Sequence, residues 1–140
     1  WVSQVNDFNT GIIEEFRSNH GVVGGPFNGS PLVLLTTTGA KSGTRRTHPL
    51  VTLAEDGRLY VFASKGGAPT NPDWYHNVVA HPEVEVEYGD ETFPAVAHVV
   101  TGAERDRLFE AQVARMPGFG EYQESAGGRV IPVVELRRTS

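Results

Sequence analysis

Two short segments of the chain combine glycines, cations and hydroxyls, the groups with which proteins commonly hold anions. The first spans residues 36–46, reads TTTGAKSGTRR, and joins the apolar run 32–35 to a strand-like run that begins at His48. Glycines let backbone N–H groups turn toward a ligand, and hydroxyls and cations complete an anion site. No Asp or Glu occurs between Phe16 and Ala54, although the formal net charge of the protein is -5. The segment therefore favours a bound anion, and the alternative is a solvated hairpin loop.

The second segment repeats this design beside a predicted helix. Residues 63–67, ASKGG, are followed by NPDWYHN at 71–77. The N-terminus of a helix attracts anions through its free N–H groups and its dipole. Two cationic glycine loops beside aromatic residues fit a long anionic aromatic cofactor. The plainer alternative for Trp74 is a core anchor.

A third segment, residues 117–123, places Phe119 and Tyr122 in the glycine-rich sequence PGFGEYQ. Aromatic residues in such a segment are expected to pack on something, either as a lid or as a wall of a substrate pocket. A tyrosine hydroxyl in such a wall could donate a hydrogen bond to a reacting oxygen.

Other kinds of site find no support in the sequence. The five histidines are scattered, cysteine is absent, and there is no HExxH motif, so no metal site is expected. Residues 39–43 read GAKSG, which matches neither the nucleophile elbow G-x-S-x-G nor a P-loop that leads into a helix. An acidic protein argues against non-specific nucleic-acid binding. No run is long enough to span a membrane, and the absence of cysteine fits a reducing cytosol.

The apolar pattern predicts a mainly β chain with peripheral helices, in the α+β class. Antiparallel connections favour a small closed or half-closed barrel, and the length of 140 residues fits one domain spanning 1–140. The predicted strands are 32–37, 48–54, 58–64, 83–88, 92–100 and 130–137. The predicted helices are 7–20, 72–80 and one from about 102 to 115, with loop or a short helical turn at 118–128.

Helix capping can also be predicted from the sequence. Asn9 or Thr10 is expected to cap the first helix, and Asn71 is expected to cap the second, with Pro72 as its first residue. Thr101 and Glu104 have the spacing of a capping box for the third helix.

Three features of the chain, taken together, resemble the deazaflavin-dependent nitroreductase family of actinobacteria. They are the segments TTTGAKSGTRRTHPL and ASKGGAPTNPDWYHN, and a late tyrosine before a final strand. The resemblance runs from about Leu32 to Leu136. It implies a split β-barrel like that of flavin-binding pyridoxamine oxidases. It also implies coenzyme F-420, a deazaflavin with a phosphorylated tail that carries glutamate.

The resemblance assigns roles to individual positions of this chain. The residues that match those holding the anionic tail are Lys41, Ser42, Gly43 and Arg46. The residues that match the loop lining the cofactor are Ser64, Lys65, Gly66 and Gly67, and those that match the remaining cofactor contacts are Trp74 and Asn77. Tyr122 matches a substrate-pocket tyrosine and is the expected catalytic hydrogen-bond donor. Phe119 and Ser125 stand in the substrate region where nitroimidazole-activating members have further tyrosines.

The expected activity is hydride transfer from reduced F-420 to a quinone, a nitroaromatic or an activated alkene. The cofactor carries the difficult step, which fits the missing nucleophile. Quinones as family acceptors would imply a cytoplasmic protein that works at the inner membrane surface. Two alternatives remain open at this point: a flavin mononucleotide oxidoreductase with the same barrel, and a non-catalytic carrier of cofactor or quinone.

Overall fold

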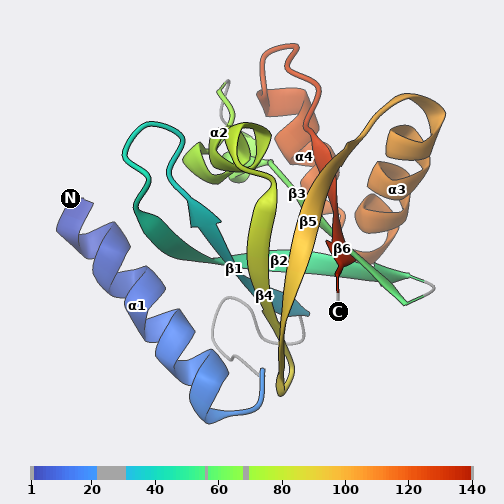
Figure 1. Cartoon of the computed structure of the whole chain (residues 1–140). Helices are drawn as coiled ribbons and strands as arrows, with labels where there is room; N and C mark the ends of the chain where they lie inside the picture. The colour runs from blue at the N-terminus through green and yellow to red at the C-terminus, as the bar shows by residue number, and fades with distance from the viewer. Residues whose placement is uncertain (1, 22–30, 56, 68–69, 140) are drawn as a thin grey trace.

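The computed structural model describes residues 2–21, 31–55, 57–67 and 70–139. In these residues the chain forms a β-barrel with helices on its outside (Figure 1). The strands are β1 (Leu32–Thr38), β2 (Arg45–Glu55), β3 (Arg58–Phe62), β4 (Glu83–Tyr88), β5 (Glu91–Val100) and β6 (Val133–Arg138). The helices are α1 (Val2–Ser18), the short 3-10 helix η2 (Lys65–Gly67), α2 (Asp73–Ala80), α3 (Gly102–Arg115) and α4 (Gly118–Ser125).

The strands close into a barrel in the order β1-β2-β3-β6-β5-β4, and every pairing is antiparallel. Closure comes from β1 and β4, where Leu35 lies opposite Val86. The predicted hairpin at Glu55–Gly57 joins β2 to β3, and Gly57 has the positive φ of 77° that favours glycine in such a turn. The predicted small barrel with peripheral helices is therefore confirmed.

The inside of the barrel is apolar because inward positions alternate with outward ones along each strand. In β4, Val84 and Val86 are buried while Glu83 and Glu85 are exposed. Trp74 of α2 belongs to this inner cluster, 5% exposed, and packs at one end of the barrel. Burying each large apolar side chain contributes about 1.5–3 kcal/mol.

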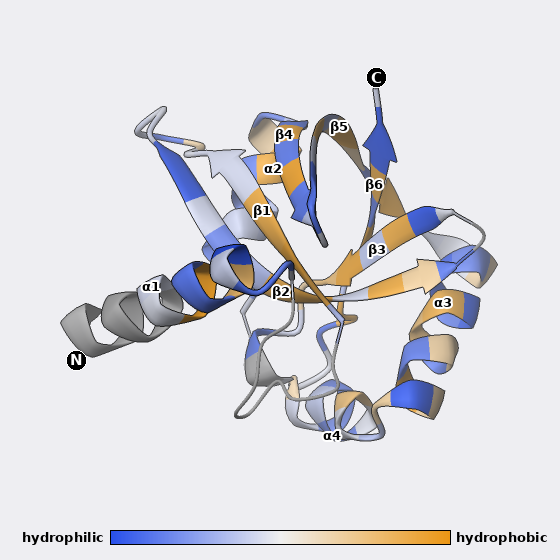
Figure 2. Cartoon of the chain, turned by 90° about the horizontal axis from the view of Figure 1, so that it is seen from below, coloured by the Kyte–Doolittle hydropathy of each residue, from blue (hydrophilic) through white to orange (hydrophobic). Residues whose placement is uncertain are grey.

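Both faces of the first half of β1 are buried, which explains the unbroken apolar run at residues 32–35 (Figure 2). Val33 and Leu35 belong to the inner cluster. Leu32 and Leu34 instead pack outside the barrel, in a small cluster with Ile12 and Phe16 of α1. A third cluster lies between the strands and helices α3 and α4, and includes Phe62, Leu108, Phe109 and Phe119.

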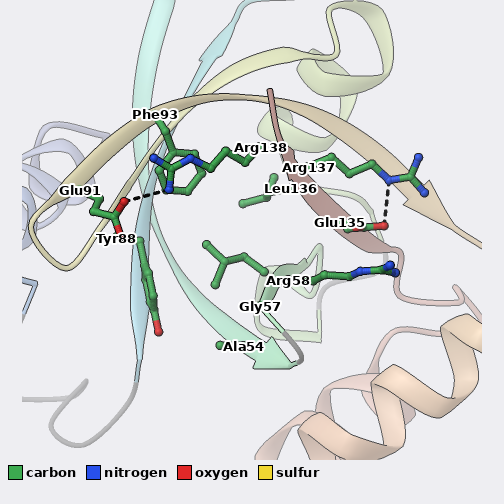
Figure 3. Close-up of a pocket in the computed structure, with 11 residues that line it drawn as sticks. Ala54, Gly57, Arg58, Tyr88, Glu91, Phe93, Glu135, Leu136, Arg137 and Arg138 are labelled. Carbon is green, nitrogen blue, oxygen red and sulfur yellow. Dashed lines mark hydrogen bonds and ion pairs between the residues drawn. The ribbon is translucent and has the colours of Figure 1, made fainter. Parts of the chain in front are cut away.

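The directions of the strands define two ends of the barrel. The β1–β2 connection, η2, α2 and α4 lie at the upper end in Figure 1, and the β4–β5 turn lies at the lower end. The lower end holds a cavity of about 380 Å3, whose wall combines Tyr88, Phe93 and Leu136 with several charged side chains (Figure 3). There the Arg138 guanidinium lies 4.5 Å from the ring centroid of Phe93 and pairs with Glu91 at 2.8 Å. Both predicted glycine loops are at the opposite, upper end.

Several predicted boundaries and caps are wrong. Helix α1 begins at Val2, so Asn9 and Thr10 lie inside it and not at its start. Helix α2 begins at Asp73 after Pro72, without a side-chain cap. The predicted cap, Asn71, instead accepts a hydrogen bond on Oδ1 from Arg129 Nη1 at 2.6 Å.

The capping box and two strand ends also differ. Thr101 precedes α3 but makes no side-chain cap bond, and the Glu104 carboxylate pairs with Arg107 at 2.8 Å. Strand β2 starts earlier than predicted, at Arg45, since residues 45–47 pair with the end of β1. Strand β6 starts later, at Val133.

Candidate functional site

The first glycine loop, residues 39–44, is a tight turn held by its own hydrogen bonds. Gly39 N–H donates to Thr44 O at 2.8 Å, and Gly43 N–H donates to Gly39 O at 3.0 Å. The Ser42 hydroxyl accepts from Thr44 N–H at 3.1 Å. A β-carbon on Gly39 would lie 2.5 Å from Ser42 Oγ, and Gly43 has a φ of 71°. Gly43 therefore has a conformational reason to be glycine, and a side chain at Gly39 would force the Ser42 hydroxyl to move.

Asn77 ties this loop to helix α2. Its side chain accepts from Ala40 N–H on Oδ1 at 3.0 Å and donates from Nδ2 to Thr37 Oγ1 at 3.1 Å. Asn77 is 8% exposed and Thr37 is fully buried. A buried amide with both ends satisfied fixes the position of its neighbours, because losing either bond would leave a buried polar group unpaired.

A cleft of about 940 Å3 lies between the first glycine loop, β2 and α2. Its lining residues are Gly39, Ala40, Lys41, Ser42, Arg46, His48, Asp73, His76 and Asn77. Lys41 and Arg46 are exposed, and neither forms an ion pair within the described residues. Among the described residues that line the cleft, Asp73 alone carries a carboxylate. An excess of unpaired cations in a cleft suits an anionic ligand. Of the predicted tail-binding residues, Gly43 alone does not line this cleft.

His48 is a cleft residue that the sequence reasoning missed. Its Nε2 lies 3.2 Å from Thr37 Oγ1, and its pKa is lowered, first by burial and then by the nearby charge of Arg46, with Asp73 opposing. The signal that could have found it is the period of two along a strand, which puts Arg46 and His48 on the same face of β2.

The second glycine loop, residues 64–67, lies outside the cleft lining and is held from the C-terminal part of the chain. Arg129 donates from Nη1 to Ala63 O and from Nη2 to Ser64 O, both at 2.8 Å. Ser125 Oγ donates to Gly67 O at 3.1 Å. Lys65 has a positive φ of 48°, which is uncommon for a residue with a side chain. Sequence reasoning missed Arg129, because its partners lie about sixty residues earlier in the chain.

Three of the predicted contacts have structural roles in the core or in the loop. Trp74 is buried in the inner cluster, as the plainer interpretation of the sequence predicts. Phe119 is 6% exposed and its ring lies 5.7 Å from that of Phe62, edge to face. Ser125 is engaged by its hydrogen bond to Gly67.

Tyr122 lies in helix α4, which spans Gly118–Ser125 and is longer than the loop or short helical turn predicted for residues 118–128. Its ring is half-buried against Phe119, with centroids 5.2 Å apart. It lines neither the lower cavity nor the cationic cleft. Helix α4 rests on η2, so Tyr122 is beside the second glycine loop and separate from the cleft.

A metal site is not evident in the part of the chain that the structure describes. In residues 2–21, 31–55, 57–67 and 70–139, no group of three or more His, Cys, Asp or Glu side chains is placed to hold a metal ion. The candidate site consists of the cationic cleft together with the second glycine loop, which precedes α2 in the chain.

Comparison with known proteins bears on this site. A family model described as F420H(2)-dependent quinone reductase matches residues 11–137. An F420H(2)-dependent quinone reductase of Mycobacterium tuberculosis is 39% identical over 127 residues, which cover 88% of this chain and 85% of that protein.

Solved structures agree with this match. An F420-H2 dependent reductase, FDR-A, is 44% identical with a TM-score of 0.70, and the match covers 76% of this chain and 94% of that one. A pyridoxamine 5'-phosphate oxidase-type protein of Listeria innocua has a TM-score of 0.56 at 14% identity, covering 79% of this chain and 85% of the other. The second likeness concerns the fold alone and confirms the expected split barrel.

Proposed function

Because the chain belongs to the F420H(2)-dependent quinone reductase family, we propose that it transfers a hydride from reduced coenzyme F-420 to a quinone. The family predicted from the glycine-loop motifs is thereby confirmed. The observation that carries the proposal for this chain is the cleft, which places Lys41, Arg46 and the first glycine loop around one space large enough for an extended anion.

The donor set of the cleft fits the tail of this coenzyme. Lys41 and Arg46 supply charge, and the Ser42 hydroxyl keeps its own proton for a ligand while it accepts from Thr44 N–H. Phosphoryl and glutamyl groups need such charged and hydroxyl donors. The volume of about 940 Å3 lies at the upper end of the range for small-molecule sites, as a long tail requires. In this proposal Asn77 acts by positioning the loop, since both ends of its amide are already occupied.

The second glycine loop is assigned to the ring end of the coenzyme. Residues 64–67 are next to α2 in sequence and are fixed by Arg129 and Ser125. When bound, the coenzyme supplies the hydride donor, and the protein supplies orientation and electrostatics. Gly66 carries no side chain that would block a flat ring, whereas the missing side chain of Gly67 allows the close approach of α4.

Tyr122 is proposed to face the acceptor. Hydride transfer to a quinone places negative charge on a quinone oxygen, and a hydroxyl that donates to this oxygen stabilises the charge as it forms. The hydroxyl of Tyr122 has no hydrogen-bond partner among the described residues, so it is available for this purpose. Phe119 and Ser125 support it, the first by packing and the second by holding the loop.

We further propose a membrane quinone as the physiological acceptor, with the protein bound peripherally at the inner face of the membrane. Within the described residues, no helix has the length and apolar character needed to cross a bilayer. Co-sedimentation with anionic vesicles that contain a long-chain quinone tests the proposal, and an unchanged supernatant fraction would contradict it.

The activity is tested by mixing the protein with reduced F-420 and menadione and following the return of oxidised coenzyme by absorbance. We expect saturable turnover that depends on both reactants. A nitroaromatic and an activated alkene serve as further acceptors. Tight binding of the coenzyme without accelerated oxidation by any of the three would instead favour the non-catalytic carrier.

A further inference from the structure

The protons in the chain of hydrogen bonds from the first glycine loop to His48 can be assigned. Ala40 N–H can only donate, so the atom of Asn77 that faces it, 3.0 Å away, is the acceptor Oδ1. The other end of the amide is then NH2, which donates to Thr37 Oγ1 at 3.1 Å. One lone pair of the Thr37 oxygen is thus used, and its single proton remains to be placed.

The remaining partner of Thr37 Oγ1 is His48 Nε2, at 3.2 Å. If Nε2 carries no proton, it accepts the Thr37 hydroxyl and every group is satisfied. If Nε2 carries a proton, the Thr37 oxygen must accept twice, and its own proton has no other acceptor among the described residues. Thr37 is fully buried, so that proton could not reach water either.

We propose that His48 is held as the neutral imidazole with its proton on Nδ1, and that this N–H donates to an anionic group of the bound coenzyme tail. The first half stands on the hydrogen-bond chain alone, and the second half rests on the proposed function. Thr37 and Asn77 are then positioning residues, which select the tautomer without touching the ligand. His48 lines the cleft with Lys41 and Arg46, so a third donor joins the two cations.

The surroundings of His48 support the neutral form. Burial and the positive charge of Arg46 lower its pKa, while Asp73 of α2 raises it by a smaller amount. The other charged or titratable groups that line the cleft are Lys41 of the first glycine loop and His76 of α2. Cations outnumber the single carboxylate there, so an uncharged donor avoids added repulsion in the free protein.

The tautomer is tested on the protein without ligand by nitrogen-15 NMR of the imidazole rings, with His48 assigned by its absence in His48→Asn. At pH 7 we expect the shift of an unprotonated Nε2 and a protonated Nδ1. Thr37→Ser keeps the hydroxyl and should keep this pattern, whereas Thr37→Val should lose it. An Nε2–H tautomer or an imidazolium in the parent at pH 7 would overturn the assignment.

The donor role is tested by calorimetric titration with oxidised F-420. The amide NH2 of His48→Asn can replace Nδ1–H, and His48→Leu cannot. We expect His48→Asn to bind within about 3-fold of the parent and His48→Leu to bind about 10-fold or more weakly, as for loss of a hydrogen bond to a charged group.

The outcomes separate the two proposals. If the parent binds F-420 and His48→Leu binds equally well, the donor role of His48 is wrong and the proposed function stands. If the parent does not bind F-420, the proposed function fails and the ligand assigned to His48 fails with it. The NMR result decides the tautomer in either case.

Discussion

A β-carbon on Gly67 would lie 2.9 Å from both the Cα and the carbonyl oxygen of Tyr122. Helix α4 and the second glycine loop therefore meet backbone to backbone, and the Ser125 hydroxyl closes the same contact by donating to Gly67 O. The residue expected to face the acceptor and the loop expected to face the ring are thus parts of one packed unit. A substitution of Gly67 should therefore alter the position of Tyr122.

Gly67→Ala should destabilise the protein by about 2 kcal/mol or more, because its φ of 83° disfavours a side chain and the new methyl group would clash with α4. Gly43→Ala is the matched control, since Gly43 has a φ of 71° but a β-carbon there would meet nothing within 4 Å. Gly43→Ala should lower the unfolding free energy only by the cost of placing a side chain at a positive φ, about 1 kcal/mol. Urea unfolding measures both, and equal losses would argue against the tight contact.

Arg129→Met should cost about 2–3 kcal/mol of unfolding free energy, because the carbonyls of Ala63 and Ser64 lose a charged donor. Arg129→Lys should recover only a part, since one ammonium cannot reproduce the forked guanidinium. Arg115→Met, at an exposed position of α3, is the control and should change stability little. Full recovery by lysine would show that charge alone matters.

Tyr122→Phe keeps the ring packed on Phe119 and removes only the hydroxyl. If that hydroxyl stabilises charge on the acceptor oxygen, kcat and kcat/KM should fall together by roughly 100-fold while coenzyme affinity stays the same. Tyr88→Phe, at the opposite end of the barrel, should leave both unchanged. A rise in KM alone would make Tyr122 a binding wall.

His48 should make stability depend on pH. Its pKa in the folded protein is lowered by burial, so the unfolded chain binds the proton more readily. The unfolding free energy should therefore fall as the pH drops below the ordinary histidine value of about 6.5, by at most about 1.4 kcal/mol per pH unit. Unfolding at pH 7.5 and pH 5 measures this, with His48→Asn as reference. Parallel losses in both proteins would contradict it.

The parts of the fold that follow local patterns could be predicted from the sequence. Alternation of Val84 and Val86 with glutamates predicts β4, and the Asp-Gly turn predicts the β2–β3 hairpin. Helix α4 could not be predicted with its full length, because Pro117 and two glycines weaken any helical pattern there. Packing of Phe119 on Phe62 and the Ser125 bond supply the missing stability from distant parts of the chain.

The candidate site likewise has features that follow local sequence patterns and features that depend on the tertiary fold. The types and spacing of Lys41 and Arg46 identify a cationic loop without any structure. The roles of Asn77, His48 and Arg129 depend on strand register and barrel closure, which bring together groups that are 11 to 66 residues apart. No local pattern encodes those contacts, so the sequence could name Asn77 but not its two hydrogen bonds.

The cleft between the first glycine loop and α2 is proposed to hold the anionic tail of F-420. The most direct test is calorimetric titration of F-420 and of flavin mononucleotide into the parent, Lys41→Ala, Arg46→Ala and the control Arg45→Ala, whose side chain lies outside the cleft. We expect F-420 to bind much more tightly than flavin mononucleotide. The two cleft variants should bind F-420 about 10- to 100-fold more weakly, and Arg45→Ala should match the parent. Tighter binding of flavin mononucleotide, or equal binding of F-420 by all four proteins, would contradict this assignment of the cleft.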